Sequence, residues 1–259
     1  MSEHSRRRVL SALCILGFFL LWEVACLGLQ IPVIVLPRPS EIIYTLIARF
    51  PAIMPHALQT VYTTFVGFGL GILIGLAIGL LIGSSKLAYD VAYPLLVGFS
   101  SIPKVAIVPI LVLWFGSGTV PAILTAMVMS VFPIVVNVAT GLATTEPELE
   151  DVMKTLGASK AEILWNVSLP RTMPYFFASL KVSVTLAFVG TVIAETVASN
   201  KGIGNLMMIA SSNYNVPLVF AGLFVLSGLG VALYLAFSLV EARVTGWTVR
   251  RDTPPLGDH

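Results

Sequence analysis

Long apolar stretches with few charged residues dominate the hydrophobic pattern of the chain. A transmembrane helix needs about 20 consecutive apolar residues, at about 1.5 Å of rise each. Six segments have this length and predict membrane-spanning helices: Val9–Leu29, Leu58–Ile82, Val91–Phe115, Val120–Leu142, Tyr175–Ala198 and Leu218–Val240. The expected fold class is therefore an all-α, polytopic membrane protein with about six transmembrane helices.

The third of these segments differs from the others because it contains Pro103, Lys104 and Pro109. Each proline removes a backbone donor and kinks or breaks a helix. A broken helix at membrane depth must be covered by protein or water. We therefore expect this segment to be interrupted and to face the protein interior or a cavity.

A short amphipathic helix is expected between the first two spans, over the sequence EIIYTLIARF. Ser40 follows Pro39 and is a suitable N-cap. The apolar positions at helical spacing are Ile42, Ile43, Leu46, Ile47 and Phe50. Such a helix is expected to lie along the outer membrane surface, and docking of an external partner there is the alternative.

Glycines recur at every fourth position of the second span. They are Gly67, Gly71, Gly75, Gly79 and Gly83. Small residues at this spacing let another helix approach closely. We expect helix packing along this stripe, with a gating hinge as the alternative.

Composition agrees with the membrane assignment. Hydrophobic residues make up 57% of the 259 residues and charged residues 11%, with a mean hydropathy of +0.94, whereas soluble domains are about 25% charged. Disorder and a soluble enzyme are thereby excluded, and the net charge of +2 gives no indication of nucleic-acid binding. Cys14 and Cys26 lie in one apolar run and are expected to be membrane-buried residues.

Basic residues divide unevenly between the two sides of the predicted membrane. With Arg6 inside, eleven of the 15 are cytoplasmic: Arg6, Arg7, Arg8, Lys86, Lys154, Lys160, Arg171, Lys181, Arg243, Arg250 and Arg251. Arg38, Arg49 and Lys201 fall outside, and Lys104 is undecided. Cytoplasmic loops carry an excess of Lys and Arg. The division predicts six spans with both termini in the cytoplasm. The first span, Val9–Leu29, is longer than the about 7–15 residues of a signal-peptide h-region, so it is expected to stay uncleaved.

One cytoplasmic segment, residues 143–174, is not explained by membrane spanning. It holds eight of the 28 charged residues (15 basic and 13 acidic), and it is too long for a simple connection. Its apolar residues form stripes at helical spacing, namely Leu149, Val152, Met153, Leu156, Ile163, Leu164 and Val167. A helix–turn–helix of this kind suits docking into a groove on a soluble partner, and packing under its own bundle is the alternative.

Local signals divide this segment into two short helices. Thr145 is the expected N-cap of the first, and Gly157 is expected to end it. Ser159 and Glu162 have the spacing of a capping box for the second. Pro170 is expected to stop that second helix.

The pattern Asp151-Val152-Met153-x3-Gly157-x9-Val167-Ser168-Leu169-Pro170 resembles the coupling loop of binding-protein-dependent ABC importer permeases. That loop reads Glu-Ala-Ala-x3-Gly-x9-Ile-x-Leu-Pro, so this chain departs from it in the first three positions. The segments LPRPSEI, IPKVAIVPILVLWFG, LGASKAEILWNVSLP and VIAET…KGIGNLM resemble the nitrate/sulfonate/taurine branch. Permeases of riboflavin and of pyrimidine thiamine precursors are similar. The resemblance covers about residues 30–247.

The resemblance implies a type I ABC importer permease fold in the bacterial inner membrane. It also implies a homodimer, two ATP-binding cassette ATPase subunits and an extracytoplasmic solute-binding protein. One docking loop per chain and two ATPases per transporter require two copies of the chain. The sequence lacks a GxxxxGK[ST] phosphate loop, so ATP and Mg are expected on the separate ATPase, with no cofactor, metal or catalytic residue in this chain.

Two groups of functional residues are expected. Those coupling the loop to the ATPase are Glu150, Asp151, Met153, Lys154, Leu156, Gly157, Ala158 and Ser159. Polar residues within the spans are candidates for the solute pathway: Ser100, Ser101, Lys104, Asn137 and Glu195. Helix-packing hydrogen bonds are the alternative for the serines and Asn137, and an interface carboxylate near Lys201 is the alternative for Glu195.

The expected division is 1–29 (N-terminus and first span), 30–56 (extracytoplasmic segment), 57–247 (core permease) and 248–259 (cytoplasmic tail). A nitrate-, sulfonate- or taurine-like anion, or a riboflavin or pyrimidine precursor, is the expected solute. The alternative function is a stand-alone secondary transporter or channel, which would leave the charged loop unexplained. An intramembrane enzyme is disfavoured because the sequence has neither HExxH nor GxSxG.

Overall fold

The computed structural model describes residues 3–245, which form helices without any strand among them. In chain order these are α1 (Glu3–Gly28), α2 (Pro39–Ala48), α3 (Phe50–Gly83), α4 (Lys86–Ser100), η1 (Lys104–Ile107), α5 (Val108–Phe115), α6 (Thr119–Ala143), α7 (Pro147–Thr155), α8 (Lys160–Ile163), the π-helical turn η2 (Leu164–Ser168), α9 (Leu169–Ala198), α10 (Ile203–Ser212) and α11 (Val216–Thr245). The all-α prediction is confirmed. The predicted tail, 248–259, lies outside the described residues.

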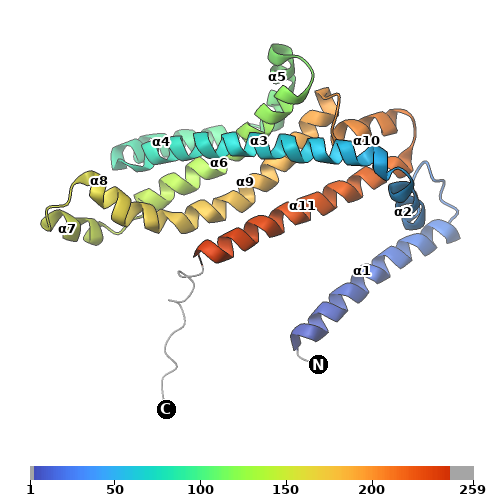
Figure 1. Ribbon diagram of the computed structural model, residues 1–259, viewed down its shortest axis with the longest axis horizontal. Coiled ribbons are helices and arrows are strands. Elements are labelled where there is room, and N and C mark those ends of the chain that lie inside the picture. The colour runs from blue at the N-terminus through green and yellow to red at the C-terminus, as the bar shows by residue number, and fades with distance from the viewer. Residues whose placement is uncertain (1–2, 246–259) are drawn as a thin grey trace.

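The long helices are arranged as an elongated bundle. Five are long and apolar enough to cross a membrane, and a sixth crossing results if the bent pair α4 and α5 counts as one span. Helices α3, α6, α9 and α11 run along the long axis (Figure 1). Helices α7 and α8 lie at one end of this bundle, and α2 and α10 lie at the other. The predicted number of about six spans is therefore confirmed.

The glycine stripe of α3 packs against α6. A Cβ atom at any of the five glycines would come within 2.8 Å of an α6 side chain. The partners of Gly67, Gly71, Gly75, Gly79 and Gly83 are Ala126, Ser130, Ile134, Val138 and Leu142, respectively. Each pair differs by the same 59 positions (126 − 67 and 142 − 83), so the two helices run parallel. The expectation of close helix packing is confirmed.

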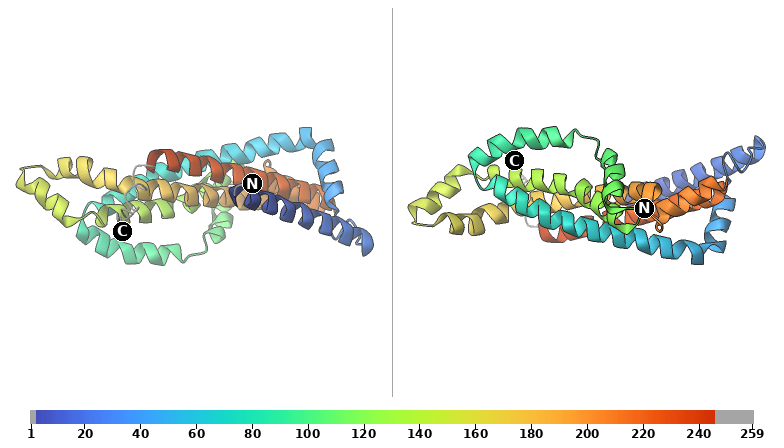
Figure 2. Two further views of the ribbon diagram at one scale, coloured as in Figure 1. Left: turned by 90° about the horizontal axis from the view of Figure 1, so that it is seen from below. Right: turned by 90° about the horizontal axis from the view of Figure 1, so that it is seen from above.

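The third span is broken, as its prolines predict. Helix α4 and the η1–α5 segment meet at an angle of 78°. Pro103 is the N-cap of η1, whereas Pro109 lies in the first turn of α5, where a missing N–H costs no hydrogen bond. Helix α4 has no buried residue and bows away from the bundle (Figure 2). Val108 and Leu111 of α5, by contrast, are buried, and Val108 packs with Ala122 of α6 and Ala194 of α9. The expectation that this segment faces the protein interior is therefore met by α5 but not by α4.

The connection between α1 and α3 corrects the predicted cap. Helix α2 begins at Pro39 with Arg38 as N-cap, because proline is favoured in the first turn. Ser40 instead donates hydrogen bonds from its backbone N–H (3.0 Å) and its hydroxyl (2.7 Å) to the Glu23 carboxylate. These bonds attach α2 to the end of α1.

The apolar face of α2 is divided between two surroundings. Ile42 is fully buried and Leu46 packs against the core of the bundle. Ile43, Ile47 and Phe50 are exposed. The five positions predicted to share one face therefore form an inward and an outward side. The outward side stays available for the predicted contact with the membrane surface.

Candidate functional site

The loop predicted to dock on a partner lies at one end of the bundle, where α7 and α8 extend past α3 and α6 (Figure 1). Helix α7 begins at Pro147 and its N-cap is Glu146, not Thr145 as predicted. The residue before a proline is pushed out of the helical region, and Glu146 has φ −59° and ψ 120°. Thr145 is instead buried.

The corner between α7 and α8 has the predicted geometry. Gly157 has φ +82°, and its N–H donates to the Lys154 carbonyl at 3.0 Å. The Ala158 N–H donates to the Met153 carbonyl, also at 3.0 Å. These two bonds form a Schellman motif, in which glycine is favoured because its φ is positive. The predicted end of the first helix is confirmed.

A capping box fixes the start of α8. The Ser159 N–H donates to Glu162 Oε2 at 2.7 Å, and the Glu162 N–H donates to Ser159 Oγ at 3.3 Å. The prediction for this pair is confirmed. Pro170, however, does not stop the helix. The turn η2 widens the backbone, with the Leu169 N–H donating to the Leu164 carbonyl five residues earlier, so the proline ring is accommodated and α8 continues into α9.

The two halves of the loop differ in exposure. On α7, Val152 is 56% exposed and Leu156 is 77% exposed. Ile163 of α8 is buried, and Leu164 of η2 lies half-buried against the core. The α8 half therefore packs under its own bundle, whereas the α7 half presents apolar side chains to its surroundings.

The residues predicted to couple the loop gather around this corner. Asp151, Lys154, Leu156, Gly157 and Ser159 are exposed, whereas Met153 and Ala158 are half-buried. Glu150 lies within α7, and its side chain is outside the described part of the chain. Lys154 and Asp151 form an ion pair at 3.0 Å. The corner is thus an apolar knob flanked by charged groups.

An ion pair that the sequence reading missed anchors the loop to α9. Arg171 Nη1 lies 2.9 Å from Glu146 Oε1, so the residue before α7 is held to the first turn of α9. Helix α9 is also continuous with α8 through η2. The loop is thus attached to α9 through the continuous backbone and through this ion pair.

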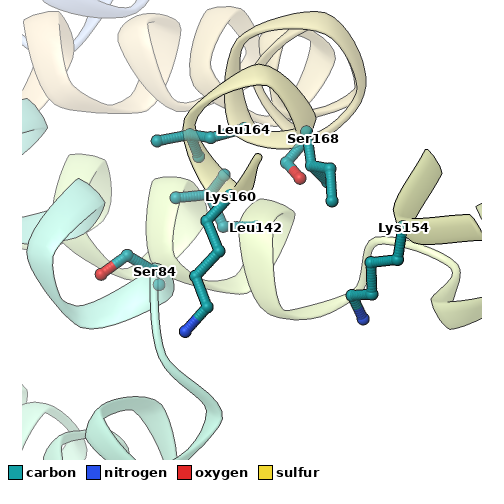
Figure 3. Close-up of a pocket in the computed structure, with 8 residues that line it drawn as sticks. Ser84, Leu142, Lys154, Lys160, Leu164 and Ser168 are labelled. Atoms are coloured by element: carbon teal, nitrogen blue, oxygen red, sulfur yellow. The ribbon is translucent and has the colours of Figure 1, made fainter. Parts of the chain in front are cut away.

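A pocket of about 230 Å³ lies between this loop and the ends of α3 and α6. Polar side chains from three segments line it, and they include Ser84, Lys154, Lys160 and Ser168 (Figure 3). Leu142 and Leu164 form its apolar wall.

Three of the five predicted pathway residues gather where α4 breaks. The hydroxyls of Ser100 and Ser101 both donate to the Val97 carbonyl. Lys104 Nζ donates to the Ser100 carbonyl at 3.1 Å and lies 4.9 Å from the centre of the Phe132 ring on α6. This arrangement places one cation and one aromatic ring side by side at the break.

Asn137, by contrast, uses its amide within its own helix. Its Nδ2 donates to the Pro133 carbonyl at 2.8 Å. Pro133 lies inside α6, so this bond joins two residues one turn apart on the same helix. The role of Asn137 in a solute pathway stays a prediction.

Glu195 is 1% exposed and lies at the far end of α9, against the start of α10. Its Oε2 accepts hydrogen bonds from Thr60 Oγ1 (2.8 Å) and from the Gly204 N–H (3.2 Å). Thr60 Oγ1 in turn accepts from the Ile203 N–H at 2.9 Å. Gly202, at φ +110°, leaves the space that the carboxylate occupies. The carboxylate therefore ties α3, α9 and α10 together.

The sequence analysis predicted Glu195 as a polar residue of the solute pathway, but it did not predict the hydrogen-bond partners of this carboxylate. Thr60 is 135 residues away in the chain, so no local spacing predicts the contact. Lys181, one of the basic residues assigned to the cytoplasmic side, pairs with Glu241 of α11 at 2.5 Å. Buried charges in a bundle are normally paired in this way.

Comparisons with known proteins cover most of the chain. The profile of a family described as "Binding-protein-dependent transport system inner membrane component" matches residues 67–246. The formylaminopyrimidine transport permease protein ThiX of Halalkalibacterium halodurans is 30% identical, over 90% of this chain and 93% of the relative. A probable ABC transporter permease protein of Haemophilus influenzae is 34% identical, over 93% and 99%. The riboflavin transport system permease protein RibX of Chloroflexus aurantiacus is 29% identical, over 87% and 85%.

The fold also has a counterpart among solved structures. A chain of the inward-facing MetNI methionine ABC transporter is similar with a TM-score of 0.65. The match covers 74% of this chain and 96% of that chain, at 21% identity. The expected fold is thereby confirmed.

Proposed function

The chain belongs to the family of binding-protein-dependent transport system inner membrane components, and from this membership we propose how it works and what it carries. It is the translocation subunit of a binding-protein-dependent ABC importer and a multi-pass membrane protein. Such a subunit works with an ATPase and a solute-binding protein.

Two copies of the chain form the pathway, with two ATPase subunits bound inside and one solute-binding protein outside. Both termini and the α7–α8 loop face the cytoplasm, in agreement with the excess of basic residues there. ATP and Mg bind to the ATPase chains, and this subunit performs no catalysis. The observation that carries the coupling proposal is the 77% exposure of Leu156 at the corner of a loop that projects from the bundle.

Coupling then follows from how the loop is attached. The exposed corner enters a groove on the ATPase, as apolar helix residues do in other helix-in-groove contacts. When the two ATPases approach each other, the corners move with them. The Glu146–Arg171 ion pair and the continuous α8–α9 backbone pass this movement to α9. Rigid-body rocking of the two copies then opens the pathway inward.

The solute is a small heteroaromatic molecule of the pyrimidine-precursor class. Two of the relatives above are named for formylaminopyrimidine and for riboflavin, both of them heteroaromatic. At the break after α4, the Phe132 ring and the Lys104 ammonium lie together. This pair supports the proposal because an aromatic ring can stack on the solute while the ammonium donates hydrogen bonds to its polar substituents. The second candidate is a nitrate-, sulfonate- or taurine-like anion, which the Lys104 charge favours.

Uptake by the assembled importer tests the function and the solute together. The permease is reconstituted into proteoliposomes with its ATPase and its solute-binding protein. We expect uptake of labelled formylaminopyrimidine that requires ATP inside and binding protein outside. Uptake of taurine but not of the pyrimidine would contradict the proposed class of solute. Uptake that persists without the ATPase would contradict the importer mechanism.

Leu156→Asp tests the coupling corner in the same vesicles. An exposed leucine contributes little to the stability of the free subunit, so the variant is expected to fold. A charge in the ATPase groove should abolish uptake and co-purification of the ATPase. Leu156→Met keeps the apolar contact and is the matched control. Full uptake by Leu156→Asp would show that the corner does not dock.

A further inference from the structure

The pocket beneath the inner loop is lined by Lys154 of the coupling group and by further polar residues, Ser84, Lys160 and Ser168, to which the coupling role assigns no function. Lys160 has no acidic partner among the described residues, and its side chain extends between Ser84 and Lys154 (Figure 3). Lys154 lines the same pocket while it pairs with Asp151. Two ammonium groups and two serine side chains thus surround about 230 Å³ of space. The chemistry of this half suits an anion.

An apolar groove of about 410 Å³ adjoins this pocket. Leu164 lines both spaces. Leu80, which also lines the groove, lies one helical turn before Ser84 on α3. Trp165, 71% exposed, and Met173, 41% exposed, form further parts of the groove. The anion pocket therefore continues into a surface that suits a hydrocarbon chain.

We propose that the pocket and the groove together bind one acidic phospholipid, with its phosphate near Lys160 and one acyl chain along Leu80, Leu164 and Met173. The basic pocket lies at the cytoplasmic end of the spans, in the orientation proposed above, and basic pockets between helices on that side bind acidic head groups. An exposed tryptophan beside the groove is typical of the membrane interface. A free phosphate would use the polar half alone and leave the groove empty.

A lipid bound at this position is expected to affect how the loop transmits movement to the spans. Its head group would lie between the end of α3 and the start of α8, two elements that the coupling movement shifts relative to the membrane. An occupied site would brace α8 against the bundle, so that movement of the corner reaches α9 without bending at the loop. Acidic lipid is therefore expected to raise the coupling between ATP hydrolysis and uptake.

Lipid retention by the assembled importer tests this site. The complex is purified in detergent and titrated with phosphatidylglycerol or with phosphatidylcholine of the same acyl chains, and bound lipid is counted by native mass spectrometry. We expect phosphatidylglycerol to bind more tightly than phosphatidylcholine. Lys160→Gln should weaken phosphatidylglycerol binding by about fivefold, since one lysine contributes about 1 kcal/mol to acidic-lipid binding.

Two further variants define the site. Lys201→Gln removes a lysine at the opposite end of the bundle and should leave phosphatidylglycerol binding unchanged. Met173→Trp fills the groove and should weaken binding of both lipids, while gel filtration checks that each complex stays assembled. Glycerol 3-phosphate should not displace the lipid.

Three results would overturn the proposal: equal binding of the two lipids, unchanged binding by Lys160→Gln, or displacement by glycerol 3-phosphate, which would assign the pocket to a free phosphate. ATP-dependent uptake is measured separately on each variant. If uptake persists while lipid selectivity is absent, the lipid site is wrong and the importer function stands.

Discussion

At the scale of single residues, Glu195 shows how a buried carboxylate is accommodated in a membrane protein. Polar groups inside a bundle are costly unless they are hydrogen-bonded. The Thr60 hydroxyl and the Gly204 backbone N–H both donate to Glu195. The latter lies in the first turn of α10, where backbone donors are free and a negative charge is favoured. Glu195 thus holds the start of α10 in place.

Replacement of Glu195 by alanine should destabilise the subunit. It would leave the Gly204 N–H without its acceptor, a loss that costs about 1–3 kcal/mol, and it would leave the Thr60 hydroxyl only the His56 carbonyl at 3.1 Å. We expect a clearly lower unfolding temperature in detergent, measured by the thermal dependence of the gel-filtration peak. Glu195→Gln keeps an acceptor oxygen, so its unfolding temperature should fall much less. Equal losses for the two variants would contradict the anchoring role.

Gly157 is a second residue whose backbone decides its role. Its φ of +82° is unfavourable for a β-branched side chain, although a Cβ atom would meet no neighbour within 4 Å. Gly157→Val should therefore cost about 1–2 kcal/mol locally and unwind the corner, with at least about a fivefold loss of ATP-dependent uptake. Gly157→Asn, which tolerates this conformation, is the control. Uptake by Gly157→Val equal to that of the asparagine variant would show that the turn is not needed.

At the scale of elements, local signals predicted some helix ends and failed at others. The Ser159–Glu162 capping box and Gly157 act within three or four residues, so spacing alone was sufficient. Thr145 and Ser40 failed as caps because a neighbouring proline set each helix start instead. The π-helical turn before Pro170 could not be predicted, since it depends on α8 packing under the bundle.

The parallel contact between α3 and α6 makes a specific prediction. Gly75→Val would place side-chain atoms where Ile134 already lies, and overpacking of this kind typically costs about 1–3 kcal/mol. We expect a lower unfolding temperature and less protein in the membrane fraction. Gly69→Val is the matched control, because it lies on the same helix and a Cβ atom there meets nothing within 4 Å. A comparable loss for Gly69→Val would point to helix propensity, not packing.

At the scale of the whole molecule, hydrophobic length and charge predicted the spans, while their mutual arrangement required the structure. Glycines at every fourth position predicted a close helix contact, but the sequence did not say that α6 would be the partner. Nor could it place α4, whose apolar side chains, such as Leu95 at 61% exposure, are not covered by the described chain. An exposed apolar surface of this kind must be covered by lipid or by a second copy of the chain.

The orientation can be tested by labelling single cysteines in a background with Cys14→Ala and Cys26→Ala. Leu156 at the inner corner and Tyr214 between α10 and α11 are 77% and 76% exposed. A membrane-impermeant maleimide applied to intact spheroplasts should label Tyr214→Cys and spare Leu156→Cys. The permease is produced without its ATPase, which would otherwise cover the Leu156 corner, and after the membrane is opened both cysteines should react. Labelling of Leu156→Cys in intact spheroplasts would reverse the proposed topology.

The constant offset of 59 positions between α3 and α6 has a consequence for how force travels through the subunit. A slide of one helix along the other by a single residue would bring all five glycines out of line with their partners at once. The two helices are therefore expected to move as one rigid unit, about 38 Å long over the 25 residues of α6. A displacement of the inner end of this unit, where Gly83 contacts Leu142, is therefore expected to tilt the outer ends of both helices.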